Sequence, residues 1–168
     1  NVEEAYESSV TATSNIIQIS SNTKGYKPER LIYTSSSMVY GNFQTSEVTE
    51  DSKCNPIEIY GTAKLSGEIT TKGLCEYFDI PWTIIRPSAV FGPTDMNHRV
   101  SQLIVDKAMR KESIDIYGKD EKLDFTYVKN LSLGFVKVAT HKNGINQIFK
   151  WKSSHHSSVS RRSKKVHT

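Results

Sequence analysis

Short apolar runs alternate with longer amphipathic stretches along this chain. The runs Arg30–Thr34 and Trp82–Arg86 are rich in β-branched and aromatic residues, which is typical of strands buried in a parallel sheet. Pro87 follows the second run directly and ends it. Between the two runs, apolar residues recur at helical spacing, which predicts a helix over Pro56–Phe78 that stops near Asp79.

Further helices and one more strand are predicted on either side of this unit. An imperfect apolar stripe predicts a helix over Asn1–Ser20 without an obvious start signal, and helical spacing also covers Arg99–Met109 and Leu131–Ala139. Ile114–Tyr117 alternates in the manner of a strand. Strands that alternate with helices predict an α/β fold with a mainly parallel sheet.

Several polar side chains with possible chemistry follow these strands or open the central helix. Ligands of parallel sheets gather beyond the carboxyl ends of the strands, and Ser36 and Ser88 both fall just past such ends. From topology alone, the simpler interpretation is that Ser36 and Ser88 are loop serines without a role in binding. Tyr60 and Lys64 lie four residues apart in a predicted helix, hence on one face, where the ammonium favours the ionised phenol. Tyr60 is therefore a candidate acid/base at neutral pH, although such residues are individually more often core edge and solvated surface.

The composition of the 168 residues is that of a globular chain long enough for one core. There is no apolar run near the roughly 18 to 20 residues that a membrane span requires, and no signal-peptide pattern. Cys54 and Cys75 lie far apart and form neither a Cys-x-x-Cys pair nor a disulfide framework, which suits a reducing compartment. We therefore expect a soluble, cytoplasmic protein in which Cys75 fills the core.

The formal net charge of +4 is concentrated at one end. Six of the 22 Lys and Arg residues and no acid lie after Phe149, whereas the residues up to Phe149 carry 16 basic and 18 acidic side chains. This division predicts a folded body over 1–149 and a disordered basic tail over 150–168, and the abrupt change in composition favours an unrelated, frame-shifted or truncated end as the origin of the tail. His155 and His156 have no Cys or carboxylate in the tail to complete a site, so we predict no metal. Nucleic-acid binding by the tail is a weak alternative, because the body is acidic and lacks an aromatic and basic patch.

Three motifs occur in a fixed order. The segment Ser35–Gly41 (SSSMVYG) is followed by Tyr60-x-x-x-Lys64 and then by Arg86–Pro93 (RPSAVFGP), with Asp124–Val128 (DFTYV) further on. This combination resembles the extended short-chain dehydrogenase/reductase family, and within it the NAD-dependent epimerases and dehydratases of nucleotide sugars. The resemblance covers about Tyr6 to Phe149 and implies a Rossmann-type, doubly wound parallel sheet.

The resemblance implies roles for particular residues. Tyr60 would be the catalytic acid/base, Lys64 would hold the nicotinamide ribose and promote loss of the tyrosine proton, and Ser36 would hydrogen-bond the reacting sugar oxygen. Contacts to NAD are implied for Ser9, Tyr60, Lys64, Pro87 and Ser88. These roles suit the chemistry, because removing a proton from a sugar hydroxyl while hydride leaves the same carbon needs a poised base, a positive charge and a donor on the oxygen. The cofactor performs the redox step.

Other residues depart from the family pattern. The glycine-rich phosphate loop (GxxGxxG) and the acidic ribose reader do not occur in the 168 residues. We therefore expect an internal fragment that lacks the first strands and most of the carboxyl-terminal substrate lobe, and that alone is inactive, binds NAD weakly and aggregates. Ser9 and Ala89 stand where Asn is usual, and Leu123 replaces an Arg that grips diphosphate. Arg99 is a candidate to supply that charge, although an exposed helical Arg is the simpler interpretation.

One departure concerns the reaction itself. Ser37 and Met38 occupy the positions of the Asp-Glu pair with which the 4,6-dehydratases eliminate water, so elimination would lack its acid and base. We therefore predict C4 epimerisation of a UDP-sugar through a transient keto sugar, with decarboxylation of a UDP-uronate, reduction or dehydration as alternatives. A non-catalytic member that binds a partner, or nothing, is the alternative outside the enzymes. The resemblance also suggests a homodimer through the helix that bears Tyr60 and Lys64.

Overall fold

A three-stranded parallel sheet lies at the centre of the molecule. The computed structural model describes residues 1–42, 48–93, 95, 100–114 and 124–151, and the structural statements below concern these residues. The sheet has the order β1 (Leu31–Thr34), β2 (Trp82–Arg86), β5 (Gln147–Lys150). Both strand pairs are parallel, and Ile84 of β2 stands opposite Tyr33 of β1 and Ile148 of β5. The predicted α/β class with a parallel sheet is confirmed.

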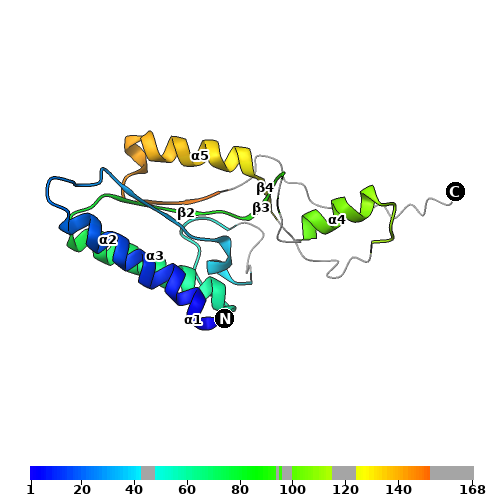
Figure 1. The fold of residues 1–168 in the computed structure, drawn as a ribbon, viewed down its shortest axis with the longest axis horizontal. Helices are drawn as coiled ribbons and strands as arrows, with labels where there is room; N and C mark the ends of the chain where they lie inside the picture. The colour runs from blue at the N-terminus through cyan, green and yellow to red at the C-terminus, as the bar shows by residue number, and fades with distance from the viewer. Residues whose placement is uncertain (43–47, 94, 96–99, 115–123, 152–168) are drawn as a thin grey trace.

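Helices cover both faces of this sheet, as Figure 1 shows. On one face lie α1 (Val2–Tyr6), a π-helical turn (Glu7–Thr11), α2 (Ala12–Asn22) and α3 (Ile59–Tyr77). The opposite face carries α5 (Val128–Thr140). Beyond the carboxyl ends of the strands, β3 (Ala89–Phe91) and β4 (Phe125–Tyr127) pair as a second small parallel sheet. The helix α4 (Val100–Met109) has no buried residue and lies apart from the layered body. Two 3₁₀ turns, η2 (Ser37–Tyr40) and η3 (Lys142–Gly144), precede α3 and β5.

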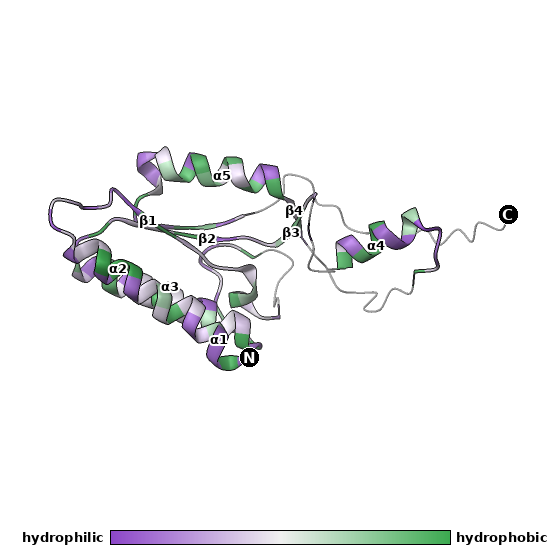
Figure 2. Cartoon of the chain, viewed as in Figure 1, coloured by the Kyte–Doolittle hydropathy of each residue, from purple (hydrophilic) through white to green (hydrophobic). Residues whose placement is uncertain are grey.

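The strand β2 is the centre of the fold because every one of its five residues is buried. A strand that is covered on both faces needs a continuous apolar run, and β-branched residues pack well on its pleated surface. The hydropathy colouring in Figure 2 shows green and purple segments alternating along the helices that cover the sheet, as expected for amphipathic helices. The buried core cluster between the helices and the sheet comprises Ile17, Tyr33, Cys75, Ile80, Trp82 and Ile84. Cys75 is a buried free thiol, as predicted, and Cys54 is also free.

The first helical segment differs from its prediction in its start, its end and its continuity. It begins at once, because the Asn1 side chain accepts a hydrogen bond from the Glu3 amide and so caps α1. A π-helical turn interrupts it at Glu7–Thr11, and α2 continues to Asn22, two residues beyond the predicted end. The expectation of a helix without a start signal was therefore wrong.

The helix α3 begins three residues later than predicted. Glu58 is extended, with φ −117° and ψ 155°, and serves as the N-cap residue, so Pro56 stays outside the helix. The end agrees with prediction, because Asp79 takes a positive φ of 52° and Pro81 follows before β2. The predicted strand Trp82–Arg86 is identical with β2, and β1 begins one residue after its predicted start.

Three strands were not predicted, and one predicted strand cannot be placed. β3, β4 and β5 span three or four residues each and lack the alternation that marks a strand. Except for Ile114, the predicted strand Ile114–Tyr117 lies outside the described residues. β5 includes Lys150, and the ring of Trp151 packs so closely on α5 that a Cβ at Gly134 would meet it at 1.8 Å. The described residues therefore continue to Trp151, two positions past the predicted boundary at 149, and the predicted tail from 152 onward lies outside them.

Within the described part of the chain, no helix combines the length and the apolar character that crossing a membrane would require.

Candidate active site

The segment that carries the predicted serine runs beside the end of β2. After β1 ends at Thr34, the Ser35 amide donates to the Ile85 carbonyl at 2.8 Å, and the Ser37 amide donates to the Pro87 carbonyl at 2.8 Å. The extended pairing of the two strands thus continues past their ends. It places Ser36 beside the residues that follow β2, as expected for the carboxyl edge of a parallel sheet.

Ser36 is the residue at which the chain turns. Its backbone is extended, with φ −156° and ψ 153°, and it caps η2 by accepting a hydrogen bond from the Met38 amide at 3.2 Å on its hydroxyl oxygen. A hydroxyl that accepts one hydrogen bond retains its own O–H for donation. Ser36 is therefore held in place and able to donate to a ligand oxygen.

Tyr60 and Lys64 face one another on the first turns of α3. The Lys64 Nζ lies 5.7 Å from the centroid of the Tyr60 ring and 5.5 Å from that of the Tyr33 ring, both within cation–π range. The same ammonium donates to the Thr34 carbonyl at 3.1 Å, so it is tied to the end of β1. Burial lowers the pKa of Lys64. The Tyr60 side chain is 50% exposed and accessible to a ligand.

A glycine brings the start of α3 against the turn that begins at Ser36. A Cβ on Gly61 would lie 2.5 Å from the Met38 carbonyl oxygen, which is closer than any ordinary contact. Only the absent side chain allows the backbone of α3 to approach η2 at this point. Tyr60, the neighbour of Gly61, is thereby brought close to the turn that Ser36 opens.

A buried ion pair lies beneath this arrangement, and sequence reasoning missed it. Arg86 Nε donates to Glu68 Oε1 at 2.8 Å, and an Arg86 terminal nitrogen donates to Glu68 Oε2 at 2.7 Å. The side chains of Glu68 and Arg86 are 1% and 4% exposed. Burial disfavours the charge of Arg86, but its hydrogen bonds to Glu68 and Tyr40 raise its pKa overall. Two signals were available in the sequence. Arg86 is a charge at the end of a buried strand and therefore requires a partner. Glu68 lies four residues after Lys64 and therefore on the same face of the helix.

The remaining predicted site residues lie in different surroundings. Ser9 is buried in the π-helical turn, and its carbonyl accepts from the Thr13 hydroxyl at 2.8 Å and the Tyr33 hydroxyl at 3.4 Å. Pro87 is buried at the end of β2, and Ser88 beside it is half-buried. Arg99 lies outside the described residues. The structure thus gathers Ser36, Tyr60, Lys64, Pro87 and Ser88 at one edge of the sheet.

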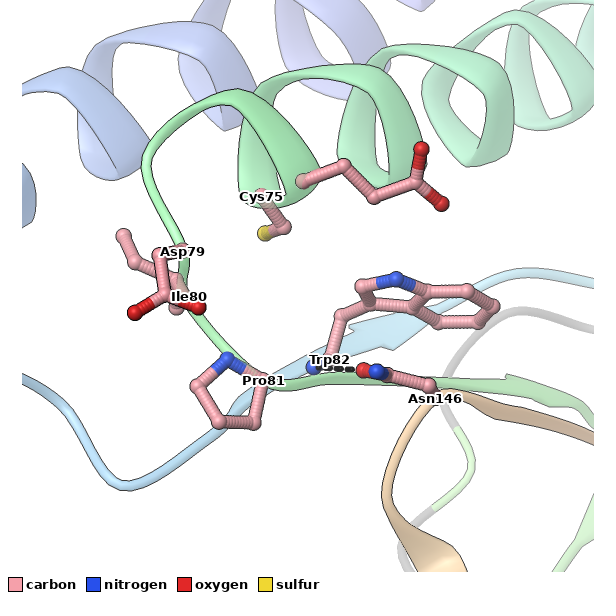
Figure 3. Close-up of a pocket in the computed structure, with 7 residues that line it drawn as sticks. Cys75, Asp79, Ile80, Pro81, Trp82 and Asn146 are labelled. Atoms are coloured by element: carbon pink, nitrogen blue, oxygen red, sulfur yellow. Dashed lines mark hydrogen bonds between the residues drawn. The ribbon is translucent and has the colours of Figure 1, made fainter.

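The opposite end of β2 carries a pocket that is separate from this site. It has a volume of about 230 Å³ (Figure 3). The end of α3, the link to β2, the first residue of β2 and the residue before β5 line it, namely Cys75, Glu76, Asp79, Ile80, Pro81, Trp82 and Asn146. The Trp82 amide donates to the Asn146 side-chain oxygen at 3.1 Å, while the buried Trp82 indole N–H has no hydrogen-bond partner among the described residues. Burial raises the pKa of Cys75 to about 11, so its thiol is protonated and unreactive at neutral pH. The residues with catalytic potential therefore lie at the other end.

Comparison with known proteins links this geometry to a family. The description of the family whose profile matches residues 1–150 is "NAD dependent epimerase/dehydratase family". An uncharacterised protein of Sinorhizobium fredii, y4nG, is 33% identical over 115 residues, which are 68% of this chain and 28% of that protein. An uncharacterised UDP-glucose epimerase of Bacillus subtilis, YtcB, is 28% identical over 111 residues, which are 66% of this chain and 35% of YtcB.

Solved structures agree with the sequence matches. UDP-glucuronic acid 4-epimerase from Bacillus cereus, crystallised with UDP-glucuronic acid and NAD, superimposes with a TM-score of 0.78 at 26% identity. The match covers 88% of this chain and 46% of that enzyme. The chain thus spans about half the length of this solved structure, and about a third of the two curated relatives.

Proposed function

Because the chain belongs to the NAD-dependent epimerase/dehydratase family, we propose that Ser36, Tyr60 and Lys64 are the catalytic group of a nucleotide-sugar epimerase. The observation that carries this proposal is their placement. Lys64 is bonded to the end of β1 and lies over the Tyr60 ring, and Gly61 sets the same helix against the turn that Ser36 opens. A base, a cation and a hydroxyl donor thus share one edge of the sheet.

Each of the three side chains has a distinct task. The Tyr60 side chain takes the proton of the reacting sugar hydroxyl as the phenolate and later returns it as the phenol, and its exposure allows the sugar to reach it. The Lys64 ammonium, held by the Thr34 carbonyl, supplies positive charge next to the Tyr60 ring. Ser36 donates a hydrogen bond to the sugar oxygen on which negative charge develops.

NAD is the cofactor of this family, and the residues of this edge fit its nicotinamide end. When bound, NAD supplies the oxidation of the sugar carbon and the reduction that follows. In this proposal Lys64 holds the nicotinamide ribose, and Pro87 and Ser88, which follow β2 beside the turn that Ser36 opens, contact the cofactor. Tyr60 and Ser9 are the other two proposed contacts, and the π-helical turn that contains Ser9 packs against α3 at Gly67. The 168 residues contain no glycine-rich loop for the pyrophosphate. The activity is therefore proposed for a protein that combines this site with such a loop.

Epimerisation at C4 of a UDP-sugar is proposed in preference to dehydration. Known relatives include both reaction types. In η2, Ser37 and Met38 follow Ser36, and neither side chain can serve as the acid or base that the elimination of water requires. The likeness to a UDP-glucuronic acid 4-epimerase supports the same choice. Arg99 is proposed to contact the diphosphate, and a homodimer in the cytoplasm is the proposed state of the enzyme.

A product analysis tests this proposal. Residues 1–150 would replace the matched half of the Bacillus cereus UDP-glucuronic acid 4-epimerase, which supplies the cofactor loop, and UDP-sugars would be followed by NMR. We expect inversion at C4, and we expect Ser36→Ala to slow it by roughly 10²-fold, as for one oxyanion donor. A 4-keto-6-deoxy product would show that the enzyme is a dehydratase. An inactive but folded graft that still binds NAD would favour a binding-only member of the family.

A further inference from the structure

Three segments of the proposed site, namely α3, the turn opened by Ser36 and the end of β2, meet at one buried ion pair. α3 contributes Glu68, four residues beyond Lys64 and eight beyond Tyr60 on the same helical face. β2 contributes Arg86, directly before Pro87. We infer that the Glu68–Arg86 pair is a positioning unit, which fixes the turn opened by Ser36 against the helix that bears Tyr60. Its consequence for catalysis rests on the proposed function, whereas the geometry stands by itself.

The pair is a rigid connection. Two parallel N–H···O bonds join the guanidinium fork to the carboxylate, and this bidentate geometry fixes orientation as well as distance. Both side chains are almost fully buried, so water does not compete for these bonds. A rotation or shift of α3 relative to β2 would have to break charge-assisted hydrogen bonds in a dry environment.

The same pair holds the Ser36 turn on both sides. The Ser35 hydroxyl, one residue before Ser36, donates to Glu68 Oε1. The Tyr40 hydroxyl, at the end of η2, accepts from Arg86 at 2.9 Å, and the Arg86 guanidinium carbon lies 4.9 Å from the Tyr40 ring centroid. The turn is thus attached to the pair before and after the residue that is proposed to bind substrate.

The loop before α3 is attached to the pair as well. Arg86 also donates to the Glu50 carbonyl at 3.1 Å, and the Glu50 carboxylate accepts from the Lys150 amide at 2.8 Å. This loop crosses the ends of β2 and β5 and leads into the helix that bears Tyr60. Four acceptor atoms, from Glu68, Tyr40 and the Glu50 carbonyl, surround the Arg86 guanidinium and join α3, the turn opened by Ser36 and the loop before α3 to the end of β2.

Amide exchange and tyrosine NMR of the full chain test this inference without any need for turnover. Tyr40→Phe removes only the hydroxyl that Arg86 contacts, and Tyr77→Phe makes the same chemical change at a position that is 80% exposed. We expect Tyr40→Phe to accelerate exchange of the Met38, Val39 and Gly41 amides at least tenfold and to shift the ring resonances of ¹³C-labelled Tyr60. The Leu31 and Ser35 amides of the sheet should keep their rates, and Tyr77→Phe should change neither readout.

Two further variants keep the test decisive. Arg86→Lys retains the positive charge but loses the bidentate guanidinium geometry. If this geometry orients α3, Arg86→Lys should shift the Tyr60 ring resonances as Tyr40→Phe does. Ser35→Ala supplies the same readouts if either substitution prevents folding. Unchanged turn amides and Tyr60 resonances, or equal acceleration of turn and sheet amides, would overturn the inference. Intact turnover after Tyr60→Phe would instead overturn the proposed function and leave this inference standing.

Discussion

The two ends of the central strand β2 lie in opposite surroundings. At its amino end, Trp82 and Ile84 pack in an apolar cluster with Ile17 and Cys75, and the adjacent pocket presents an unreactive thiol. At its carboxyl end, the last residue, Arg86, is surrounded by hydrogen-bonding partners from α3, η2 and the loop before α3.

The difference separates what stabilises the fold from what orients the site. Apolar burial is non-directional and follows the area removed from water, so the amino end can stabilise the fold without fixing the direction of any group. Hydrogen bonds to buried charges are directional, and each unsatisfied member is costly. The proposed catalytic side chains lie at the directional end.

The largest change in stability is expected from breaking the ion pair on one side only. Glu68→Leu leaves the Arg86 guanidinium buried without its counter-charge, which should lower the free energy of unfolding by about 3–5 kcal/mol in urea titrations. The double variant Glu68→Leu/Arg86→Leu should recover most of this loss, because it leaves no lone charge. A double variant as unstable as the single one would refute the view that an unpaired charge causes the loss.

At the apolar end, truncation is expected to cost slightly less. Ile84 is fully buried, so Ile84→Ala should lower the free energy of unfolding by about 2–5 kcal/mol, and Ile84→Val by about 0.5–1.5 kcal/mol. The same urea titrations measure both. Equal losses for the two variants would show that the buried volume of the Ile84 side chain does not determine the loss of stability.

Alkaline pH should weaken the core through Tyr33. Burial raises the pKa of Tyr33 to about 12, compared with about 10 in an unfolded chain. The folded state therefore keeps this proton when the unfolded state has lost it. The stabilisation is complete below pH 10, and up to roughly 3 kcal/mol is lost as the pH rises to 12. The stability difference between the wild type and Tyr33→Phe should shrink across this window, and a constant difference would contradict the assignment.

Two glycines of α3 offer a matched pair of smaller effects. Gly61→Ala drives a Cβ into the Met38 carbonyl and should cost about 1–3 kcal/mol. Gly73 has nothing within 4 Å of an added Cβ, so Gly73→Ala should stabilise the helix by about 0.5–1 kcal/mol. Thermal unfolding distinguishes the signs, and destabilisation by both would show that the close approach at Gly61 is not the cause.

Some elements could be predicted because their signals are local. The strand at Trp82–Arg86 is a continuous buried run that a proline ends, and both predicted bounds agree with β2. α5 (Val128–Thr140) begins before and ends after the predicted helix Leu131–Ala139, because helix ends carry weaker signals than helix centres. The short strands β3 and β4 are stabilised by pairing with each other, which no local pattern reveals.

The candidate site shows the same limit. The proximity of Tyr60 and Lys64 follows from helical spacing and could be predicted. The partnership of Glu68 with Arg86 depends on how α3 packs against β2, and Ser35 and Tyr40 join it only because η2 folds back over the strand end. Pairing across the fold is set by topology, so the sequence indicated a need for a partner without identifying it.

The central claim, that Tyr60 performs the proton transfer, is tested most directly by the turnover number of Tyr60→Phe. In the graft of residues 1–150 described above, kcat for C4 inversion should fall about 10²–10⁴-fold, while the unfolding midpoint stays unchanged because the phenol is half exposed. Tyr77→Phe is the control, and it should keep both values. A Tyr60→Phe graft whose kcat stays within about threefold of the parent would contradict the account.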